Sequence, residues 1–223
     1  MDLSKSYEFF QPEKVTERIH IIGCGSVGST VAENLVRCGL TKLTLWDFDT
    51  VEEHNIVNQM FRASDVGRNK AEALKDILRE INPDIGDEME IKPEGWQGKM
   101  LSGYLMVFVD SIDLRRKIVE KHIDNPNVRA VFDIRTMLTG AQHYAADWSS
   151  YQAKQNLLAS MQFTDEEASA EETVSACGTV LGVATTVRLI SAYCVNNFLN
   201  FAKGGELKKM VLMDGFSFTL TAF

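Results

Sequence analysis

The chain has 223 residues, of which 45% are hydrophobic and 24% are charged, and its formal net charge is −8. These values are typical of a soluble globular protein, and the length suits one large α/β domain or one domain with a small appendage. The acidic balance, without any run of Lys or Arg, argues against a nucleic-acid partner.

The first residues and the cysteines indicate the compartment. The polar opening lacks the apolar core of a signal peptide, and no apolar run approaches the roughly 20 residues of a membrane span. The four cysteines are Cys24, Cys38, Cys177 and Cys194. They form no C-x-x-C pair, so we expect neither a structural zinc site nor a disulfide framework. We therefore predict a cytoplasmic protein with reduced thiols and no membrane partner.

Apolar runs and helical patterns alternate along the chain after a polar lead-in over 1–16. Strands are predicted at 19–22, 43–46, 89–91, 105–109, 129–133 and 140–146. Helices are predicted at 27–38, 69–81, 114–123 and 179–201. A C-terminal hairpin is predicted over 210–222 around Asp214-Gly215, since Asp-Gly favours tight turns. Residues 147–176 show no periodic face, so we predict an irregular crossing segment.

This order of elements indicates the fold class. It favours a Rossmann-like, mainly parallel sheet with helices on both faces and a C-terminal antiparallel extension. We expect a single domain over 1–223. Residues 18–135 would form its nucleotide-binding half, and residues 136–223 would add the crossing segment, the long helix and the hairpin.

A glycine-rich turn follows the first predicted strand. Gly23, Gly25 and Gly28 fit G-x-G-x-x-G, in which the glycines permit the tight turn, the approach of phosphate and close helix packing, respectively. The helix that follows presents free N–H groups and a partial positive charge to an anion. The motif alone also occurs in dehydrogenases and methyltransferases, and the alternative is a turn that merely packs.

An acid ends the second predicted strand. Asp47 lies about twenty residues past the last glycine, where a carboxylate can accept hydrogen bonds from two ribose hydroxyls. Asp49 is one strand period further on, and it either faces the same site or caps a turn. Strand, glycine turn, helix, strand and acid together indicate a mononucleotide-binding unit.

More motifs follow in a fixed order after this unit. They read Asp47-Phe-Asp49-x-Val, Asn55-x-x-x-Gln59, Asp65-Val-Gly-x-x-Lys70-Ala and Asp110-x-x-Asp113. With the glycine turn, this series resembles the ThiF/MoeB/HesA superfamily of ubiquitin-activating-enzyme-like adenylyltransferases. The resemblance covers about 18–123 and, more loosely, the rest of the chain.

The resemblance implies an adenylation domain that uses ATP and Mg²⁺. In such proteins the C-terminal glycine carboxylate of a small ubiquitin-like or sulfur-carrier protein attacks the α-phosphate of ATP. An acyl-adenylate forms and pyrophosphate leaves. The positions that match the family motif directly are Gly23, Gly25, Gly28, Asp47, Asn55, Lys70 and Asp113.

The residue types suit this chemistry. Lys70 can reach phosphate oxygens as a point charge, and Asp113 suits Mg²⁺, which prefers carboxylate oxygen. Asn55 and Gln59 can hydrogen-bond ATP or the incoming carboxylate, and Arg62 can stabilise charge on the phosphates. The structural alternatives are a solvated helix charge for Lys70, a helix N-cap for Asp113 and a surface ion pair for Arg62.

The chain also departs from the family pattern. Asn58 stands where many members carry arginine, so Arg62 or Arg68 would have to supply that charge. Only lysines precede Arg18, so the arginine that the family's homodimers insert across their interface has no match. The paired C-x-x-C zinc site is missing as well. These departures fit a compact bacterial or phage-like branch, and they leave a homodimer or a heterodimer open.

Three further residues are candidates in this context. Some family members pass the acyl group to a cysteine of the crossing segment, and Cys177 precedes the long predicted helix, whose dipole would favour the thiolate. The alternative for Cys177 is a small buried residue that begins a core helix. Asp133 and Arg135 end a strand at the presumed ligand edge, where they either bind the partner's tail or pair with each other.

Rival functions remain open. An NAD(P)-dependent oxidoreductase would use the same glycine turn, but it would give Lys70 and Asp113 no role. A non-catalytic subunit of an activating system would explain Asn58 and the missing arginine. A third rival activates another small carboxylate, such as a modified base or a peptide terminus. In the favoured hypothesis, the crossing segment clamps the extended tail of the partner protein.

Overall fold

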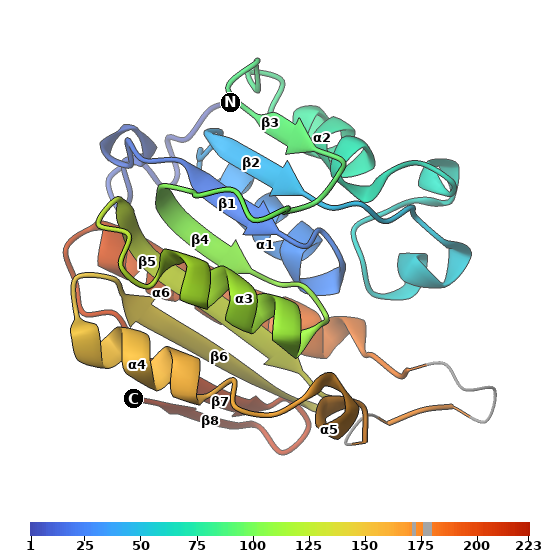
Figure 1. Cartoon of the computed structure of the whole chain (residues 1–223). Helices are drawn as coiled ribbons and strands as arrows, with labels where there is room; N and C mark the ends of the chain where they lie inside the picture. The colour runs from blue at the N-terminus through green and yellow to red at the C-terminus, as the bar shows by residue number, and fades with distance from the viewer. Residues whose placement is uncertain (171–172, 176–179) are drawn as a thin grey trace.

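The computed structural model describes residues 1–170, 173–175 and 180–223. Within these residues eight strands form one sheet in the order β3-β2-β1-β4-β5-β6-β7-β8 (Figure 1). The parallel part comprises β1 (Ile19–Ile22), β2 (Leu43–Trp46), β3 (Glu90–Lys92), β4 (Gly103–Val107) and β5 (Val128–Thr136). The antiparallel extension comprises β6 (Gly140–Asp147), β7 (Met210–Asp214) and β8 (Thr219–Ala222). The predicted Rossmann-like fold class is confirmed.

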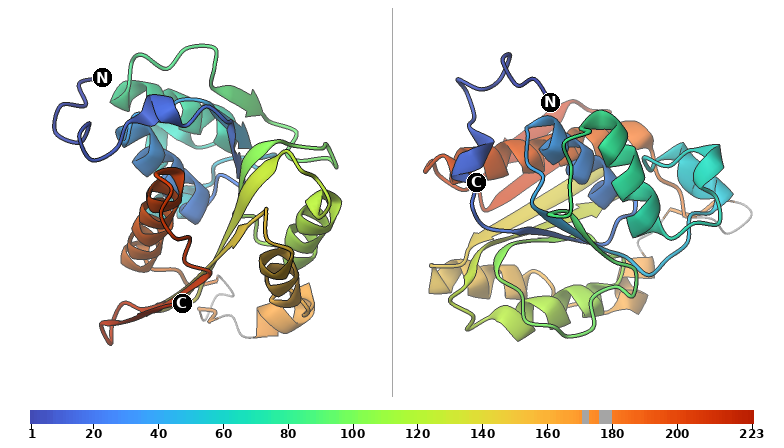
Figure 2. Two further views of the ribbon diagram at one scale, coloured as in Figure 1. Left: turned by 90° about the vertical axis from the view of Figure 1, so that its left-hand side faces the viewer. Right: turned by 90° about the horizontal axis from the view of Figure 1, so that it is seen from above.

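Helices cover both faces of this sheet, as predicted (Figure 2). One face carries α1 (Ser26–Arg37), α2 (Lys70–Ile81) and α6 (Ala184–Ala202). The other carries α3 (Ile112–His122) and α4 (Tyr151–Ala159). The strands supply both cores by alternation, since Ile19 and Ile21 belong to the first cluster of buried side chains and Ile22 to the second. Single 3₁₀ turns occur at Pro12–Lys14, Glu53–Val57 and Ala63–Asp65.

Side-chain caps fix where the helices begin at the functional edge of the sheet. Asn69 accepts hydrogen bonds from Ala71 N and Glu72 N, at 3.0 and 3.2 Å, and so begins α2. Ser111 Oγ accepts one from Leu114 N at 3.1 Å. This cap starts α3 at Ile112, two residues earlier than the apolar pattern predicted.

The prediction of an irregular segment over 147–176 is wrong, because this stretch contains α4 and a short helix, α5 (Asp165–Ala170). In α4 only Ala153 and Leu157 are buried, which is too narrow a stripe to show as periodicity. The helix α5 begins with a capping box in which Thr164 and Glu167 each accept a hydrogen bond from the other's backbone N–H.

The prediction for the start of the long helix is also wrong. Residues 180–183 are not helical, and α6 begins at Ala184. Before it, Leu181 N donates to Thr173 O at 2.8 Å, and Val174 forms an antiparallel bridge with Val180. The end of the crossing segment is therefore a small paired strand arrangement rather than the first turns of a helix.

The C-terminal hairpin is confirmed, with β7 and β8 paired from Asp214 and Thr219 outward. Its connection spans 215–218 instead of a two-residue turn. Asp214 Oδ1 accepts hydrogen bonds from Phe216 N and Ser217 N, which shapes this longer turn. Among the described helices, none has the length and apolar character that a membrane crossing requires.

Candidate nucleotide site

The candidate site lies at the carboxyl ends of three neighbouring parallel strands. In the register of the sheet Ile22, the last residue of β1, pairs with Trp46 of β2 and with Val107 of β4. The glycine turn, Asp47 and the Asp110–Asp113 stretch follow these three ends directly. Open α/β sheets bind ligands at this edge, because loops from adjacent strands converge there.

The three glycines of the turn differ in their surroundings. Gly23 has φ +93°, and a Cβ built on it would lie 2.7 Å from the Phe108 carbonyl. A Cβ on Gly28 would overlap the Gly23 carbonyl oxygen. A Cβ on Gly25 would meet nothing within 4 Å, and no described side chain caps α1. Gly23 and Gly28 therefore close the turn, while Gly25 leaves open space before a helix N-terminus that suits phosphate.

Asp47 is held beside this turn. Its Oδ2 accepts a hydrogen bond from Cys24 N at 2.6 Å, and its Oδ1 accepts one from Asp49 N at 2.8 Å. Burial raises the pKa of Asp47. Each carboxylate oxygen keeps a second lone pair, so Asp47 can still accept hydrogen bonds from ribose hydroxyls. Burial also raises the pKa of the Cys24 thiol well above its ordinary value, which marks Cys24 as a packing residue.

A buried lysine lies next to Asp47. Lys70 Nζ donates to Asp49 Oδ2 at 2.8 Å, and Lys70 is only 8% exposed, so the alternative of a solvated helix charge is wrong. The sequence analysis missed Asn69, whose Nδ2 donates to Asp47 O and Asp49 O at 3.0 and 3.2 Å. Its signal was a capping residue type at the first position of the predicted helix. Asn69 thus links the start of α2, which carries Lys70, to the backbone of the two acids after β2.

The loop after β2 brings its amides toward α1. Asn55 is buried, and its Oδ1 accepts a hydrogen bond from Glu52 N at 2.9 Å. Met60 N donates to Ser29 Oγ at 3.3 Å, which ties the loop to the first turns of α1. The Oε1 atom of Gln59 is buried and lacks a hydrogen-bond partner among the described residues. A buried amide oxygen of this kind suits a donor group on a ligand.

Asp113 lies in the first turn of α3. Ser111 is the N-cap of this helix, so the alternative that Asp113 is the cap is wrong. Asp113 Oδ1 accepts a hydrogen bond from Arg116 Nη1 at 2.8 Å, and its side chain is 45% exposed. The sequence analysis also missed Asp165, whose carboxylate accepts hydrogen bonds from Ser111 Oγ and Ile112 N at 2.8 and 2.6 Å.

Comparison with known proteins identifies the family. The model of the ThiF family matches residues 11–223. The chain belongs to the ThiF family. Its curated relatives include ubiquitin-like modifier-activating enzyme 5 of Arabidopsis thaliana, 46% identical over 74 residues, and that of Caenorhabditis elegans, 41% identical over 78 residues. These matches cover 33% and 34% of this chain but 17% and 19% of the relatives, so the chain spans a small part of their length.

Solved structures share the ThiF-type fold. PaaA superposes with a TM-score of 0.73 at 17% identity, over 100% of this chain and 68% of PaaA. Escherichia coli MccB, in a crystal structure with ATP, superposes with a TM-score of 0.75 at 17% identity, over 95% of this chain and 65% of MccB. At these identities the likeness shows the fold alone.

Either Arg62 or Arg68 is predicted to supply the charge of the ThiF-family arginine that Asn58 replaces. Arg62 pairs with Glu80 at 2.7 Å, and both side chains are more than half exposed, as in the surface-pair alternative. Arg68 pairs with Asp65 at 3.1 Å and with a further acid of α2. A phosphate contact from either arginine stays a prediction, and it would require one of these ion pairs to open.

The predicted thioester residue, Cys177, lies outside the described residues. The long helix that was predicted to follow it directly begins at Ala184. Asp133 and Arg135 pair with each other at 2.8 Å, which is the second of the two predicted alternatives. Asp133 is fully buried and also binds Arg115, so this carboxylate holds the strand end together.

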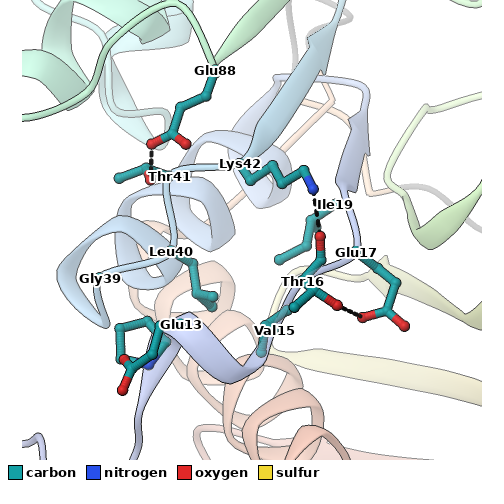
Figure 3. Close-up of a pocket in the computed structure, with 11 residues that line it drawn as sticks. Glu13, Val15, Thr16, Glu17, Ile19, Gly39, Leu40, Thr41, Lys42 and Glu88 are labelled. Atoms are coloured by element: carbon teal, nitrogen blue, oxygen red, sulfur yellow. Dashed lines mark hydrogen bonds between the residues drawn. The ribbon is translucent and has the colours of Figure 1, made fainter.

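A hollow of about 410 Å³ lies at the opposite, amino-terminal end of the sheet (Figure 3). Two of its polar side chains donate hydrogen bonds to other residues of the wall. Lys42 Nζ donates to Thr16 O, and Thr41 Oγ1 donates to Glu88 Oε1. The hollow lies beside Ile19, the first residue of β1, whereas the glycine turn follows Ile22 at the other end of this strand.

Proposed function

We propose that this ThiF-family chain binds MgATP at the carboxyl edge of the sheet and adenylates the C-terminal glycine of a small ubiquitin-like or sulfur-carrier protein. The observation that carries the proposal is the set of Asp47, Asp49 and buried Lys70 beside an open glycine turn. The similarity to ubiquitin-like modifier-activating enzymes supports the choice of substrate class.

The binding step follows from the residues of the turn and its neighbours. The space at Gly25 and the uncapped N-terminus of α1 receive phosphate oxygens, and Asp47 accepts hydrogen bonds from the ribose hydroxyls. Lys70 supplies a positive charge that Asp49 keeps in place from one side. The unpartnered Gln59 Oε1 accepts a hydrogen bond from the nucleotide or the partner's tail.

The residues around Asp113 fit Mg²⁺ bound mainly through the nucleotide. No group of three or more His, Cys, Asp or Glu side chains gathers into a metal cage within the described residues. Mg²⁺ usually keeps several waters and binds one or two carboxylates together with substrate phosphates, so a single exposed carboxylate is sufficient. Asp113 would hold the ion through Oδ2, and the bound ion would neutralise charge on the leaving pyrophosphate.

The reaction needs positioning and charge neutralisation from the protein. An oxygen of the glycine carboxylate attacks the α-phosphorus of ATP, the bond from that phosphorus to the bridging oxygen breaks, and pyrophosphate leaves with the electron pair. Lys70 stabilises the negative charge that shifts onto the phosphate oxygens. The products are an acyl-adenylate and pyrophosphate, so no oxidant or further co-reactant is needed.

We assign the partner's tail to the crossing segment. Toward the end of this segment Val174 forms an antiparallel bridge with Val180. Both side chains are apolar, and they are 54% and 53% exposed, respectively. Exposed apolar side chains beside a nucleotide site suit an extended peptide tail. Cys177 lies between these two valines in the sequence, and transfer of the acyl group to it would be a second step of the same function.

The test is ATP–pyrophosphate exchange with purified candidate partners that end in glycine. Exchange should require the partner's intact C-terminal glycine and disappear in Lys70→Ala. Lys42→Ala serves as the matched control, because Lys42 lies at the opposite end of the sheet. NADH oxidation by the wild-type chain, without partner-dependent exchange, would support the oxidoreductase rival instead.

A further inference from the structure

The bend between α4 and α5, defined as residues 160–165, is docked on the first turn of α3. Asp165 Oδ2 accepts a hydrogen bond from Ser111 Oγ at 2.8 Å, and its Oδ1 accepts one from Ile112 N at 2.6 Å. The N–H of Asp113 points to the same Oδ1 at 3.4 Å. One carboxylate from the crossing segment thus serves three consecutive residues at the start of α3, and the third is the candidate metal ligand.

A single guanidinium joins the same bend to the side chain of that ligand. Arg116 donates to Met161 O from Nε and Nη2, at 2.9 and 2.6 Å, and also to Phe163 O. Its Nη1 donates to Asp113 Oδ1 at 2.8 Å. Arg116 therefore fixes one carboxylate oxygen of Asp113 with the same guanidinium that holds the bend. The other oxygen, Oδ2, has no hydrogen-bond partner among the described residues.

A second arginine holds the beginning of the bend against the sheet. Arg135 donates to Ser160 O and Ser160 Oγ at 2.7 and 2.9 Å, and its guanidinium lies 4.5 Å from the Tyr144 ring centre. Arg135 is itself fixed by the buried Asp133. The bend is thus anchored on β5 and on α3, so its position depends on the rigid part of the fold.

The far end of the crossing segment is anchored on the other side of the candidate site. A Cβ on Gly182 would lie 2.7 Å from Asn58 Nδ2, so the chain just before α6 runs directly against the loop that carries Asn55 and Gln59. The bend therefore contacts the helix turn that bears Asp113, and the chain just before α6 contacts the loop that bears Asn55 and Gln59.

We propose that Asp165 and Arg116 are positioning residues that couple the crossing segment to the metal ligand Asp113. The proposal rests on the proposed function, in which Asp113 binds Mg²⁺. With the bend docked, the backbone of the first α3 turn is held by Asp165 and the Asp113 carboxylate is held through Oδ1 by Arg116. A ligand held in one rotamer binds a metal without losing further side-chain freedom.

The coupling predicts a defect in metal binding that is separate from nucleotide binding. Groups that orient a metal ligand typically contribute 10- to 100-fold to metal affinity, so we expect Asp165→Ala and Arg116→Met each to weaken Mn²⁺ binding to the ATP complex by roughly tenfold. The affinity for ATP without metal should stay unchanged, because neither residue contacts the glycine turn. Asp165→Asn should retain part of the affinity, since its single amide oxygen can still accept the hydrogen bond from Ile112 N while the bond that Ser111 Oγ donates to the second carboxylate oxygen is lost.

The test uses the full chain and measures Mn²⁺ titration by electron paramagnetic resonance in the presence of ATP. Glu166→Ala is the matched control, because it removes a neighbouring acid of α5 without touching α3. Limited proteolysis between residues 160 and 170 is the second readout. Both Asp165→Ala and Arg116→Met should speed this cleavage several-fold, whereas Glu166→Ala should not.

The outcomes separate this inference from the proposed function. If the wild type binds Mn²⁺ with ATP and the two variants match Glu166→Ala in both readouts, the coupling is wrong while the function stands. If the variants are cleaved faster but bind Mn²⁺ like the wild type, the bend is purely structural and the coupling is again wrong. If the wild type binds no Mn²⁺ with ATP, the proposed function fails, and the coupling fails with it.

Discussion

Replacing Gly28 with alanine tests how the glycine turn is built. A Cβ on Gly28 would lie only 1.9 Å from the Gly23 carbonyl oxygen, which is far closer than van der Waals contact allows. That oxygen cannot retreat easily, because Gly23 is itself packed against the Phe108 carbonyl. Overpacking of this kind costs about 1–3 kcal/mol, and a clash with backbone belongs at the upper end, against a gain of about 1 kcal/mol in helix propensity.

We therefore expect Gly28→Ala to lower the free energy of unfolding by about 2 kcal/mol. For a chain of this size the corresponding fall in Tm is roughly 4–8 °C. Gly25→Ala is the matched control, because a Cβ there meets nothing within 4 Å. The free energy of unfolding of the control should lie within about 1 kcal/mol of the wild-type value. The control should nevertheless bind ATP more weakly, because its methyl group enters the space for phosphate.

Calorimetry and urea unfolding measure the stabilities of the two variants, and isothermal titration measures ATP binding. If Gly28→Ala has the same Tm as the wild type, the turn is looser than its contacts indicate. If Gly25→Ala is as destabilised as Gly28→Ala, the two glycines do not have the separate roles assigned to them. Either result would refute the reasoning.

Other predictions concern buried and exposed charges. Burial lowers the pKa of His20 and His143 from 6.5 to about 4, so stability present above pH 6.5 is lost as the pH falls. By pH 5 each histidine should lower the free energy of unfolding by about 2 kcal/mol, and unfolding at that pH should be accompanied by measurable proton uptake. Arg62→Ala breaks an exposed pair with Glu80 and should cost less than about 1 kcal/mol, so lost exchange with unchanged Tm would reveal a phosphate role. Asp133→Asn leaves buried Arg115 and half-buried Arg135 without their carboxylate and should cost about 3 kcal/mol in chemical unfolding; a change below about 1 kcal/mol would contradict this.

The parts of the site that are local in sequence were predictable. The glycine turn follows a buried strand directly, and Asp47 and Asp49 end the next one, so apolar runs and turn residues were sufficient to place them. Lys70 was placed correctly on its helix. Its burial was not predictable, because it depends on the pairing of Asn69 and Thr50 across the loop.

The missed contacts join segments far apart in the chain. Asp165 caps a helix that begins 53 residues earlier, and no pattern near Asp165 distinguishes it from the other acids of α5. The approach of Gly182 to Asn58 depends likewise on tertiary packing. The failure to see α4 has a different cause: one pair of buried side chains, Ala153 and Leu157, gives too weak a periodic signal.

Equilibrium binding of MgATP and of NAD to the wild-type chain and to Lys70→Ala tests the central claim most directly. The account predicts that the wild type binds MgATP and discriminates against NAD. It also predicts that Lys70→Ala loses about tenfold or more in ATP affinity while Lys42→Ala does not, since a charged hydrogen bond contributes about 1.5–3 kcal/mol. Preferential binding of NAD, or wild-type ATP affinity in Lys70→Ala, would contradict it.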